Sequence, residues 1–266
     1  MIICATCGTS YDTPPHPSCC AICEEERQYV PADGQKWTNV EELNAKHANK
    51  WTQHEAQLLS LQTVPAFAIN QRAFLLRTPE GNLLWDCIAL LDESTQTIIE
   101  ALGGLSGIAI SHPHYYTRMQ DWAAAFNVPI WLHASDREWI QRDSPFIQLW
   151  QGESLRLNAE VDLIRMGGHF AGGTVLHWHK DDGVLLAGDI IQVTPGADRV
   201  SFMWSYPNML PLPATVVGSM AEKAKQLNFE RIYGAFAGQD IKTQAGKIVS
   251  ESAQKYIDCL TRESPH

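Results

Sequence analysis

The sequence predicts an α/β fold in which two β-rich halves each close with helices and form a sandwich of sheets covered by helices. Two observations predict this class. Apolar runs alternate with turn signals over residues 58–91 and again over residues 154–189, as in successive antiparallel strands. Segments with helical apolar periodicity follow the strands in each half. A cysteine-rich segment at residues 1–30 precedes both halves, so we expect a small additional unit there.

The first 57 residues divide into that small unit and a connection. Residues 1–30 carry five cysteines among turn-forming residues and have little core of their own. Residues 31–57 are predicted to be a linker followed by a helix, because Thr38 with Glu41 three residues later is a capping-box pattern. We expect this helix to run to about His54. Residues 58–266 are then predicted to form the main domain.

Strands and helices alternate along the main domain. After the strands of residues 58–91, short apolar runs predict strands at 106–111 and 128–135, with helices at 117–126 and near 136–142. In the second half we expect strands at 154–168, a hairpin at 173–189 with "DDG" at its turn, a helix at 214–228, a strand at 229–236 and a helix at 241–260.

Charge and composition exclude several functional classes. The formal net charge is −10 and Lys and Arg form no cluster, so a nucleic-acid partner is not expected. The N-terminus lacks the pattern of a signal peptide, and no apolar run approaches the ~18 residues of a membrane span. We therefore expect a cytoplasmic protein without a membrane segment.

Several candidate ligands stand at predicted strand ends. In "SHPHYY", His112 and His114 are one residue apart, and on an extended loop both rings would point the same way. His169 lies on the Gly-rich turn "GGHFAGG", where a ring can approach another loop closely. Asp189 and Asp86 each follow a buried apolar run. Histidine nitrogen and carboxylate oxygen are zinc ligands, so this set predicts a metal site.

The order and context of these residues resemble the metallo-β-lactamase fold superfamily. The matching elements are Asp86, His112-x-His114, Gly168-His169-x-x-Gly172 and Gly188-Asp189, within about residues 58–262. The resemblance implies an αβ/βα four-layer sandwich with its site at the sheet edges between the halves. It implies that His112, His114 and His169 bind one zinc ion, that Asp189 is the carboxylate able to bridge two metals, and that Asp86 holds the histidine loop.

The sequence departs from the family pattern at the second metal. The family's HxHxDH motif appears here as His112-Pro-His114-Tyr115-Tyr116-Thr117, and no histidine occurs in the late segment 232–240. A three-histidine site with an open fourth position is then expected. In that site Asp189 would orient a water molecule or take its proton, and Tyr115 or Tyr116 would donate to a developing oxyanion.

The N-terminal cysteines predict a second zinc ion. Cys4-x2-Cys7 and Cys20-x2-Cys23 are separated by twelve residues, the pattern of a zinc ribbon. A structural zinc would supply folding free energy that so short a segment lacks. Cys19 or His16 remains an alternative fourth ligand, and a redox or disulfide cluster is the alternative to metal.

The expected function is hydrolysis of an ester, thioester, amide or phosphoester with one core zinc. Trp204 and Tyr206, on the long loop after Asp189, are candidate substrate contacts, although covering the core is the other interpretation. The alternative to an enzyme is an inactive zinc-binding scaffold whose ribbon contacts a protein partner. An RNA-processing relative is disfavoured by the missing second metal site and by the acidity. A homodimer is compatible with the sequence.

Overall fold

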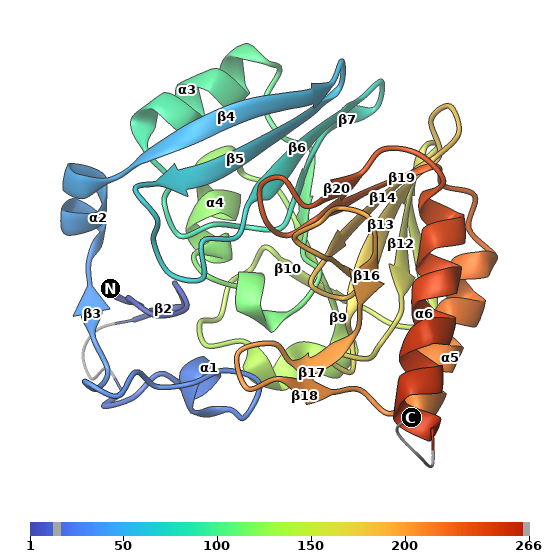
Figure 1. The fold of residues 1–266 in the computed structure, drawn as a ribbon. Helices are drawn as coiled ribbons and strands as arrows, with labels where there is room; N and C mark the ends of the chain where they lie inside the picture. The colour runs from blue at the N-terminus through green and yellow to red at the C-terminus, as the bar shows by residue number, and fades with distance from the viewer. Residues whose placement is uncertain (13–16, 263–266) are drawn as a thin grey trace. The chain divides into compact units, whose positions relative to one another are not determined.

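The computed structural model describes residues 1–12 and 17–262, which form two compact units, Met1–Trp150 and Gln151–His266. Each unit contains one large sheet with helices (Figure 1). The mixed α/β class predicted from the sequence is confirmed.

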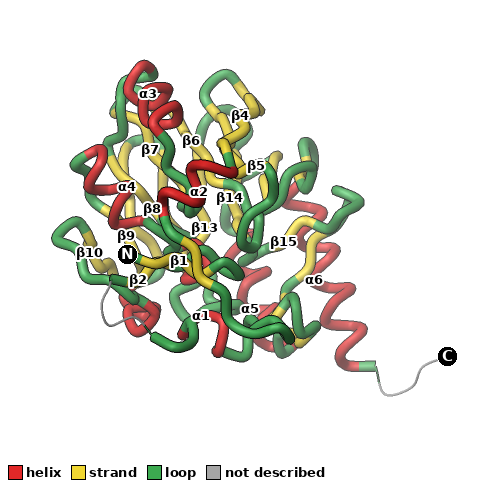
Figure 2. The backbone as a smooth tube through the Cα atoms, turned by 90° about the vertical axis from the view of Figure 1, so that its left-hand side faces the viewer, coloured by secondary structure: helices red, strands yellow, loops and turns green. Residues whose placement is uncertain are grey.

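The N-terminal segment of the first unit is a three-stranded sheet of order β2-β1-β3. The strands are β1 (Ile2–Cys4), β2 (Ser10–Tyr11) and β3 (Trp37–Thr38), and the short helix α1 (Ala21–Glu24) belongs to the same segment (Figure 2). Helix α2 (Val40–Lys46) follows, and its N-cap is Asn39, whose side chain accepts from the Glu42 amide. The cap therefore lies one residue after the predicted Thr38.

The predicted helix to His54 is wrong beyond Lys46. Residues Ala48–Glu55 form strand β4, which pairs antiparallel with β5 from Ala48↔Val64 to Glu55↔Leu58. A long run of ladder hydrogen bonds to a neighbouring strand outweighs the weak helix propensity of these mainly polar residues. The segment between 31 and 57 thus contributes an edge strand to the main sheet.

That sheet has seven strands in the order β10-β9-β8-β7-β6-β5-β4. The strands after β4 are β5 (Leu58–Val64), β6 (Ala73–Thr78), β7 (Gly81–Trp85), β8 (Gly107–Ala109), β9 (Ile130–His133) and β10 (Ile147–Trp150). The helices are α3 (Glu93–Ala101) and α4 (Met119–Phe126), with 3-10 turns η1 (Pro113–Tyr115) and η2 (Ala134–Trp139). Strands β7 to β10 are parallel, so their carboxyl ends share one edge of the sheet. The loops that carry Asp86 and His112 leave from that edge.

The second unit is built on a six-stranded sheet of order β11-β12-β13-β14-β19-β20. Its strands are β11 (Ser154–Asn158), β12 (Val161–Arg165), β13 (Thr174–Trp178), β14 (Val184–Gly188), β19 (Arg231–Gly234) and β20 (Asp240–Ile241). Two small hairpins follow Asp189: β15 (Gln192–Val193) with β16 (Val200–Ser201), and β17 (Met203–Ser205) with β18 (Leu210–Pro211). The predicted long loop therefore has regular structure.

Helices α5 (Ala214–Lys225) and α6 (Ala245–Thr261) run side by side in this unit (Figure 1). Their apolar faces pack with β13, β14 and β19 in one buried cluster that includes Leu185, Val217 and Val249. Burial of such side chains stabilises a fold by about 1.5–3 kcal/mol each. This core fixes the end of β14, where Asp189 lies.

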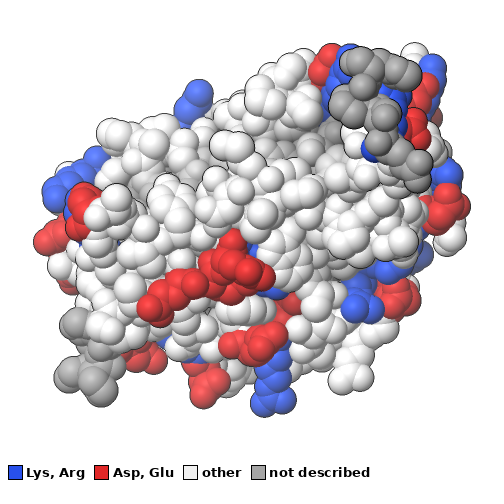
Figure 3. Space-filling view, turned by 60° about the horizontal axis from the view of Figure 1, so that its bottom comes forward, with Lys and Arg blue, Asp and Glu red and all other residues white. Residues whose placement is uncertain are grey.

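Among the described residues, none of the helices has both the length and the apolar character needed to span a bilayer. On the face drawn in Figure 3, Lys and Arg side chains are scattered among Asp and Glu side chains. Near the middle of that face the charged side chains are mainly acidic.

Candidate metal centres

The four ribbon cysteines come together in the first unit. Cys4, Cys7, Cys20 and Cys23 are all buried, and their sulfur atoms lie within 4.8 Å of one another. The sulfurs of Cys4 and Cys23 are 3.6 Å apart, and those of Cys7 and Cys20 are 3.5 Å apart. None of the four forms a disulfide. Cys19 is not part of this group, and His16 lies outside the described residues.

The surroundings of the cluster favour ionised sulfur at Cys4 and Cys20, whose thiol pKa values are lowered. The Tyr11 hydroxyl lies 3.2 Å from the Cys20 sulfur, and the Gln35 side-chain amide donates to the Cys4 sulfur at 3.2 Å. Hydrogen bonds from Cys20 and Cys23 lower the pKa of the Cys4 thiol, whereas burial raises the pKa of Cys7. Four thiolates this close repel one another, so a divalent cation is what allows all of them to ionise. The donor set fits zinc.

The sequence around Pro113 shapes the first histidine loop. His112 precedes a proline and is therefore restricted to extended backbone, at φ −169° and ψ 170°. Pro113 then starts the 3-10 turn Pro113–Tyr115, because its fixed φ suits the first helical position. The sequence suggested an extended loop, whereas the structure has a 3-10 turn within it. The rings of His112 and His114 nevertheless lie close, with centroids 5.1 Å apart, and both are buried.

Asp86 fixes the start of that loop. Its Oδ1 accepts a 2.7 Å hydrogen bond from the Ser111 backbone amide, and the Ser111 hydroxyl lies 2.8 Å from His112 Nδ1. Asp86 has a left-handed backbone, with φ +64°, which Asp tolerates better than most residues. Left-handed non-glycine residues cluster at functional sites. This arrangement is the one expected of a residue that supports metal ligands.

The two tyrosines after His114 direct their hydroxyls at backbone. Tyr115 donates to the Arg72 carbonyl at 3.2 Å and Tyr116 to the Asp136 carbonyl at 3.4 Å. Both side chains are buried, and burial raises the pKa of Tyr116 well above its usual range. Donation to a substrate oxyanion would require one of these bonds to break. The role of Tyr115 and Tyr116 in catalysis stays a prediction.

His169 is presented by a turn that favours glycine. Gly168 has φ +80°, and a Cβ there would lie 2.6 Å from the sulfur of Met220. The His169 Nδ1 lies 2.8 Å from the Trp204 carbonyl and 3.1 Å from the Met203 carbonyl. A carbonyl only accepts, so Nδ1 carries the proton and the lone pair of the neutral ring is on Nε2. Metal-bound histidines are commonly fixed in this way.

Asp189 follows β14 directly and is also buried. Gly188 before it has φ +53°. The Tyr206 hydroxyl donates to the Asp189 carbonyl at 2.9 Å, and burial raises the pKa of that phenol. Trp204 supports His169 through its carbonyl. Both predicted substrate contacts thus support the backbone and ring of candidate ligands, and contact with substrate stays a prediction.

The sequence analysis did not identify the groups that hold the candidate ligands in place through hydrogen bonds. Tyr11 and Gln35 contact cysteine sulfurs, and the Met203 and Trp204 carbonyls orient His169. In the sequence Tyr11 and Gln35 are ordinary aromatic and polar residues, and no characteristic spacing marks them as supports of a metal site. Backbone carbonyls leave no sequence signal at all.

Comparison with known proteins gives one close relative and many structural neighbours. The chain is 46% identical over 270 residues to the uncharacterized protein YmaE of Bacillus subtilis (strain 168), covering 99% of this chain and 98% of that protein. No protein-family model matches the chain.

Solved structures with the same fold include metallo-β-lactamases. VMB-1 has a TM-score of 0.62 at 9% identity, covering 80% of this chain and 98% of that chain. The DIM-1 metallo-β-lactamase has a TM-score of 0.60 at 13% identity, covering 78% and 97%. A metallo-β-lactamase from Staphylococcus aureus subsp. aureus COL has a TM-score of 0.51 at 15% identity, covering 83% and 68%. The metallo-β-lactamase fold predicted from the sequence is confirmed.

Proposed function

The chain belongs to the same family as YmaE of Bacillus subtilis and has the metallo-β-lactamase fold, and from this we propose that it is a metal-dependent hydrolase. In this proposal His112, His114 and His169 hold one zinc ion with a fourth position open to water, and Asp189 is the carboxylate that acts on that water. Cys4, Cys7, Cys20 and Cys23 hold a second, structural zinc. The core zinc, when bound, would lower the pKa of a water ligand to about 7.

The observation that carries the proposal is the tautomer of His169. Two backbone carbonyls accept from Nδ1, which leaves the Nε2 lone pair as the donor that zinc needs. His133 provides a contrast within the same chain. Its Nδ1 accepts from the Ser135 amide at 3.2 Å, so the proton of the neutral ring is on Nε2. The two buried histidines are therefore prepared for different roles.

The chain's own residues would have distinct tasks in hydrolysis. Asp189, a buried carboxylate, would accept a proton from the attacking water, since burial strengthens such an electrostatic contact. Asp86 would keep the His112 loop in position through Ser111. A site with one metal suits carbonyl substrates such as esters, thioesters and amides better than phosphodiesters, which commonly use two metals.

A non-catalytic scaffold is the second candidate. The specific observation in its favour is that the hydroxyls of Tyr115 and Tyr116 are both bound to backbone carbonyls. A scaffold would retain both zinc ions without turnover and would bind a protein partner through residues 1–30. The cytoplasmic location and the possible homodimer also remain predictions.

Metal content distinguishes the ligand sets. We expect two zinc ions per wild-type chain by elemental analysis, and one in each of the double variants His112→Ala/His114→Ala and Cys7→Ser/Cys20→Ser. The control His133→Ala should retain two. Retention of two ions by the His112→Ala/His114→Ala variant would contradict the core site.

Activity then separates enzyme from scaffold. Wild-type protein with two zinc ions should hydrolyse at least one member of a panel of esters, thioesters, amides and phosphoesters. Asp189→Asn should reduce kcat by about 10²–10⁴-fold, the usual contribution of a positioned proton acceptor. Two bound ions with no turnover across the panel would favour the scaffold.

A further inference from the structure

The ribbon is bonded directly to the end of the histidine loop. The Ser10 backbone amide donates to the Thr117 carbonyl at 3.0 Å, and the Ser10 hydroxyl donates to the same carbonyl at 2.8 Å. Ser10 follows the first cysteine pair by three residues, and Thr117 follows His114 by three. Two donors on one acceptor fix the position of that carbonyl. The bonds thus connect the cysteine cluster with the loop that carries His112 and His114.

Thr117 has a backbone that its own side chain disfavours. Its φ is +24°, and a β-branched residue with positive φ persists only where its surroundings enforce it. Gly8 of the ribbon lies against it, since a Cβ added to Gly8 would be 3.3 Å from Thr117 Cγ2. The ribbon turn is therefore part of what enforces the loop conformation.

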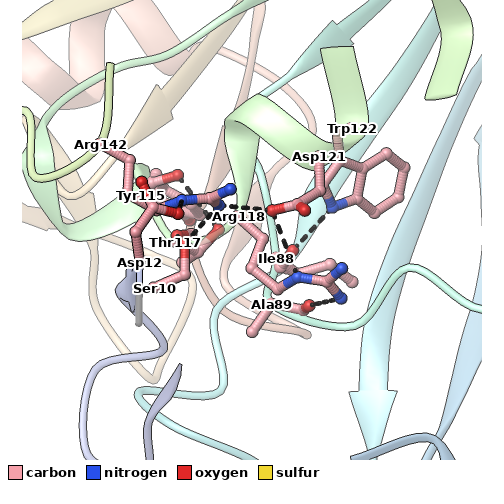
Figure 4. A network of polar contacts seen from close by, with 10 residues as sticks. All are labelled: Ser10, Asp12, Ile88, Ala89, Tyr115, Thr117, Arg118, Asp121, Trp122 and Arg142. Atoms are coloured by element: carbon pink, nitrogen blue, oxygen red, sulfur yellow. Dashed lines mark hydrogen bonds and ion pairs between the residues drawn. The ribbon is translucent and has the colours of Figure 1, made fainter. Parts of the chain in front are cut away.

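Arg142 extends the connection to the helix after the loop. Its Nη1 donates to the Ser10 hydroxyl at 3.0 Å and to Asp121 at 2.6 Å, and its Nε donates to Asp12 at 3.0 Å (Figure 4). Asp121 belongs to α4, the helix that follows the histidine loop. The hydroxyl of Ser10 thus accepts from Arg142 while it donates to Thr117. The side chains of Ser10, Arg142 and Asp121 together join the ribbon, the loop and α4.

The cysteine cluster controls the turn that carries Ser10. The Gly8 amide donates to the Cys4 carbonyl at 2.8 Å, the Cys4 amide donates to the Thr9 carbonyl at 2.9 Å, and Cys7 Sγ lies 3.2 Å from Thr9 Oγ1. Only Gly8 and Thr9 separate Cys7 from Ser10, so a movement of Cys7 also moves Ser10. Without a cation the cluster lacks the metal–sulfur bonds that would hold Cys7 in place, and the turn is less firmly held.

We propose that the metal-loaded ribbon holds the His112–His114 loop in its ligand-binding conformation, in place of the second metal ion whose ligand positions are occupied by Tyr116 and Thr117. Metal in the cysteine cluster then raises the metal affinity of the histidine site, and by linkage metal in the histidine site raises that of the cluster. The part of this inference that concerns affinity rests on the proposed function. The part that concerns loop conformation does not.

Hydrogen exchange tests the conformational part without any core metal. The reporters are the amides of Tyr115, Tyr116 and Met119, which donate to carbonyls within the loop. They are measured by mass spectrometry in a His112→Ala/His114→Ala background, with and without Ser10→Ala. Ser10→Ala should accelerate their exchange about 2- to 12-fold, the change that corresponds to losing one ordinary hydrogen bond. Unchanged exchange would overturn the proposal.

Two controls make the exchange result specific. Ser106→Ala removes a comparable hydroxyl bond, that to the Asn82 carbonyl at 2.9 Å, and should leave exchange in residues 111–119 unchanged. Cys7→Ser/Cys20→Ser should accelerate exchange there at least as much as Ser10→Ala, whereas Cys259→Ser, at an exposed cysteine, should not. If the double cysteine variant does not fold, Ser10→Ala with an intact cluster decides the question.

Affinity is measured on the chain with native histidines. Competition with a chelator should show that Ser10→Ala weakens zinc binding at the histidine site about 2- to 12-fold, while the ribbon retains its ion. Accelerated exchange with unchanged affinity would overturn the linkage. Absence of a histidine-site ion in wild-type protein would refute the proposed function, and the exchange experiment would still decide whether the ribbon holds the loop.

Discussion

Substitution of Asp86 tests whether the histidine loop is held from its first residue. Asp86 is 1% exposed, and its carboxyl Oδ1 accepts a 2.7 Å bond from the Ser111 amide. Three variants separate its contributions. Asp86→Asn keeps an oxygen acceptor and tolerates the backbone φ of +64°, Asp86→Gly keeps only the backbone conformation, and Asp86→Ala keeps neither.

The magnitudes follow from those differences. A hydrogen bond to a charged group contributes about 1.5–3 kcal/mol, and a neutral acceptor gives roughly half of that. Asp86→Asn should therefore cost about 1 kcal/mol and Asp86→Gly about 1.5–3 kcal/mol. Asp86→Ala adds the cost of a left-handed backbone, about 1–2 kcal/mol, which brings its total to about 2.5–5 kcal/mol.

Urea unfolding followed by tryptophan fluorescence gives these free energies at a fixed metal load. The acceleration of Ser111 amide exchange should follow the same order: smallest in Asp86→Asn, larger in Asp86→Gly and largest in Asp86→Ala. The matched control is Asp92→Ala, which removes a similar 2.7 Å bond to the Thr95 amide at the start of α3. It should cost about 0.5–2 kcal/mol and leave Ser111 exchange unaltered. Three Asp86 variants within 0.5 kcal/mol of wild type would refute the reasoning.

Two further predictions concern the second unit. Gly168→Ala should lower the free energy of unfolding in urea by about 2–5 kcal/mol, because the new Cβ contacts Met220 and the backbone is left-handed. The control is Gly152→Ala, with φ +94° and no atom near its Cβ, which should cost only about 1–2 kcal/mol; equal costs would exclude the contact. Burial lowers the pKa of His177 in the folded chain. As pH drops below about 6.5 the unfolded chain therefore binds a proton that the folded chain does not, and the free energy of unfolding should fall. His177→Gln should flatten this dependence between pH 7.5 and 5.5, and an unchanged slope would contradict the assignment.

Elements with a clear apolar period were predictable from this sequence, and the helices expected at 117–126, 214–228 and 241–260 are present as α4, α5 and α6. Alternating apolar residues around β5 to β7 and β11 to β14 are local signals, and the structure has strands in those segments. Strand β4 was interpreted as helix because its polar residues have no clear period and its stability comes from pairing with β5. The predicted helix near 136–142 is the 3-10 turn Ala134–Trp139, and helix α3 was not anticipated despite its Asp92 cap.

The candidate ligands could be selected from the sequence because their chemistry and order are unusual. What the sequence could not supply is which nitrogen of each ring is protonated. His169 and His133 are both buried histidines near strand ends, yet opposite hydrogen bonds at Nδ1 distinguish them. Similarly, the hydroxyl of Tyr206 looked available to a substrate, but it donates to the Asp189 carbonyl. Such partners are distant along the chain and are chosen by the fold.

The contact of Gly8 with Thr117 also bears on how this lineage can change. A second core metal site with the family's ligands would need an aspartate at position 116, a histidine at position 117 and a histidine in the late segment 232–240, which has none. A Cβ added to Gly8 would already lie 3.3 Å from Thr117 Cγ2, so the larger imidazole of a histidine at position 117 would crowd the ribbon turn. An aspartate at position 116 would place a carboxylate where the Tyr116 side chain is buried, at a cost in desolvation. Each of these substitutions made alone would carry a cost before the others could help to bind a metal ion, so a second core metal is not easily gained one substitution at a time.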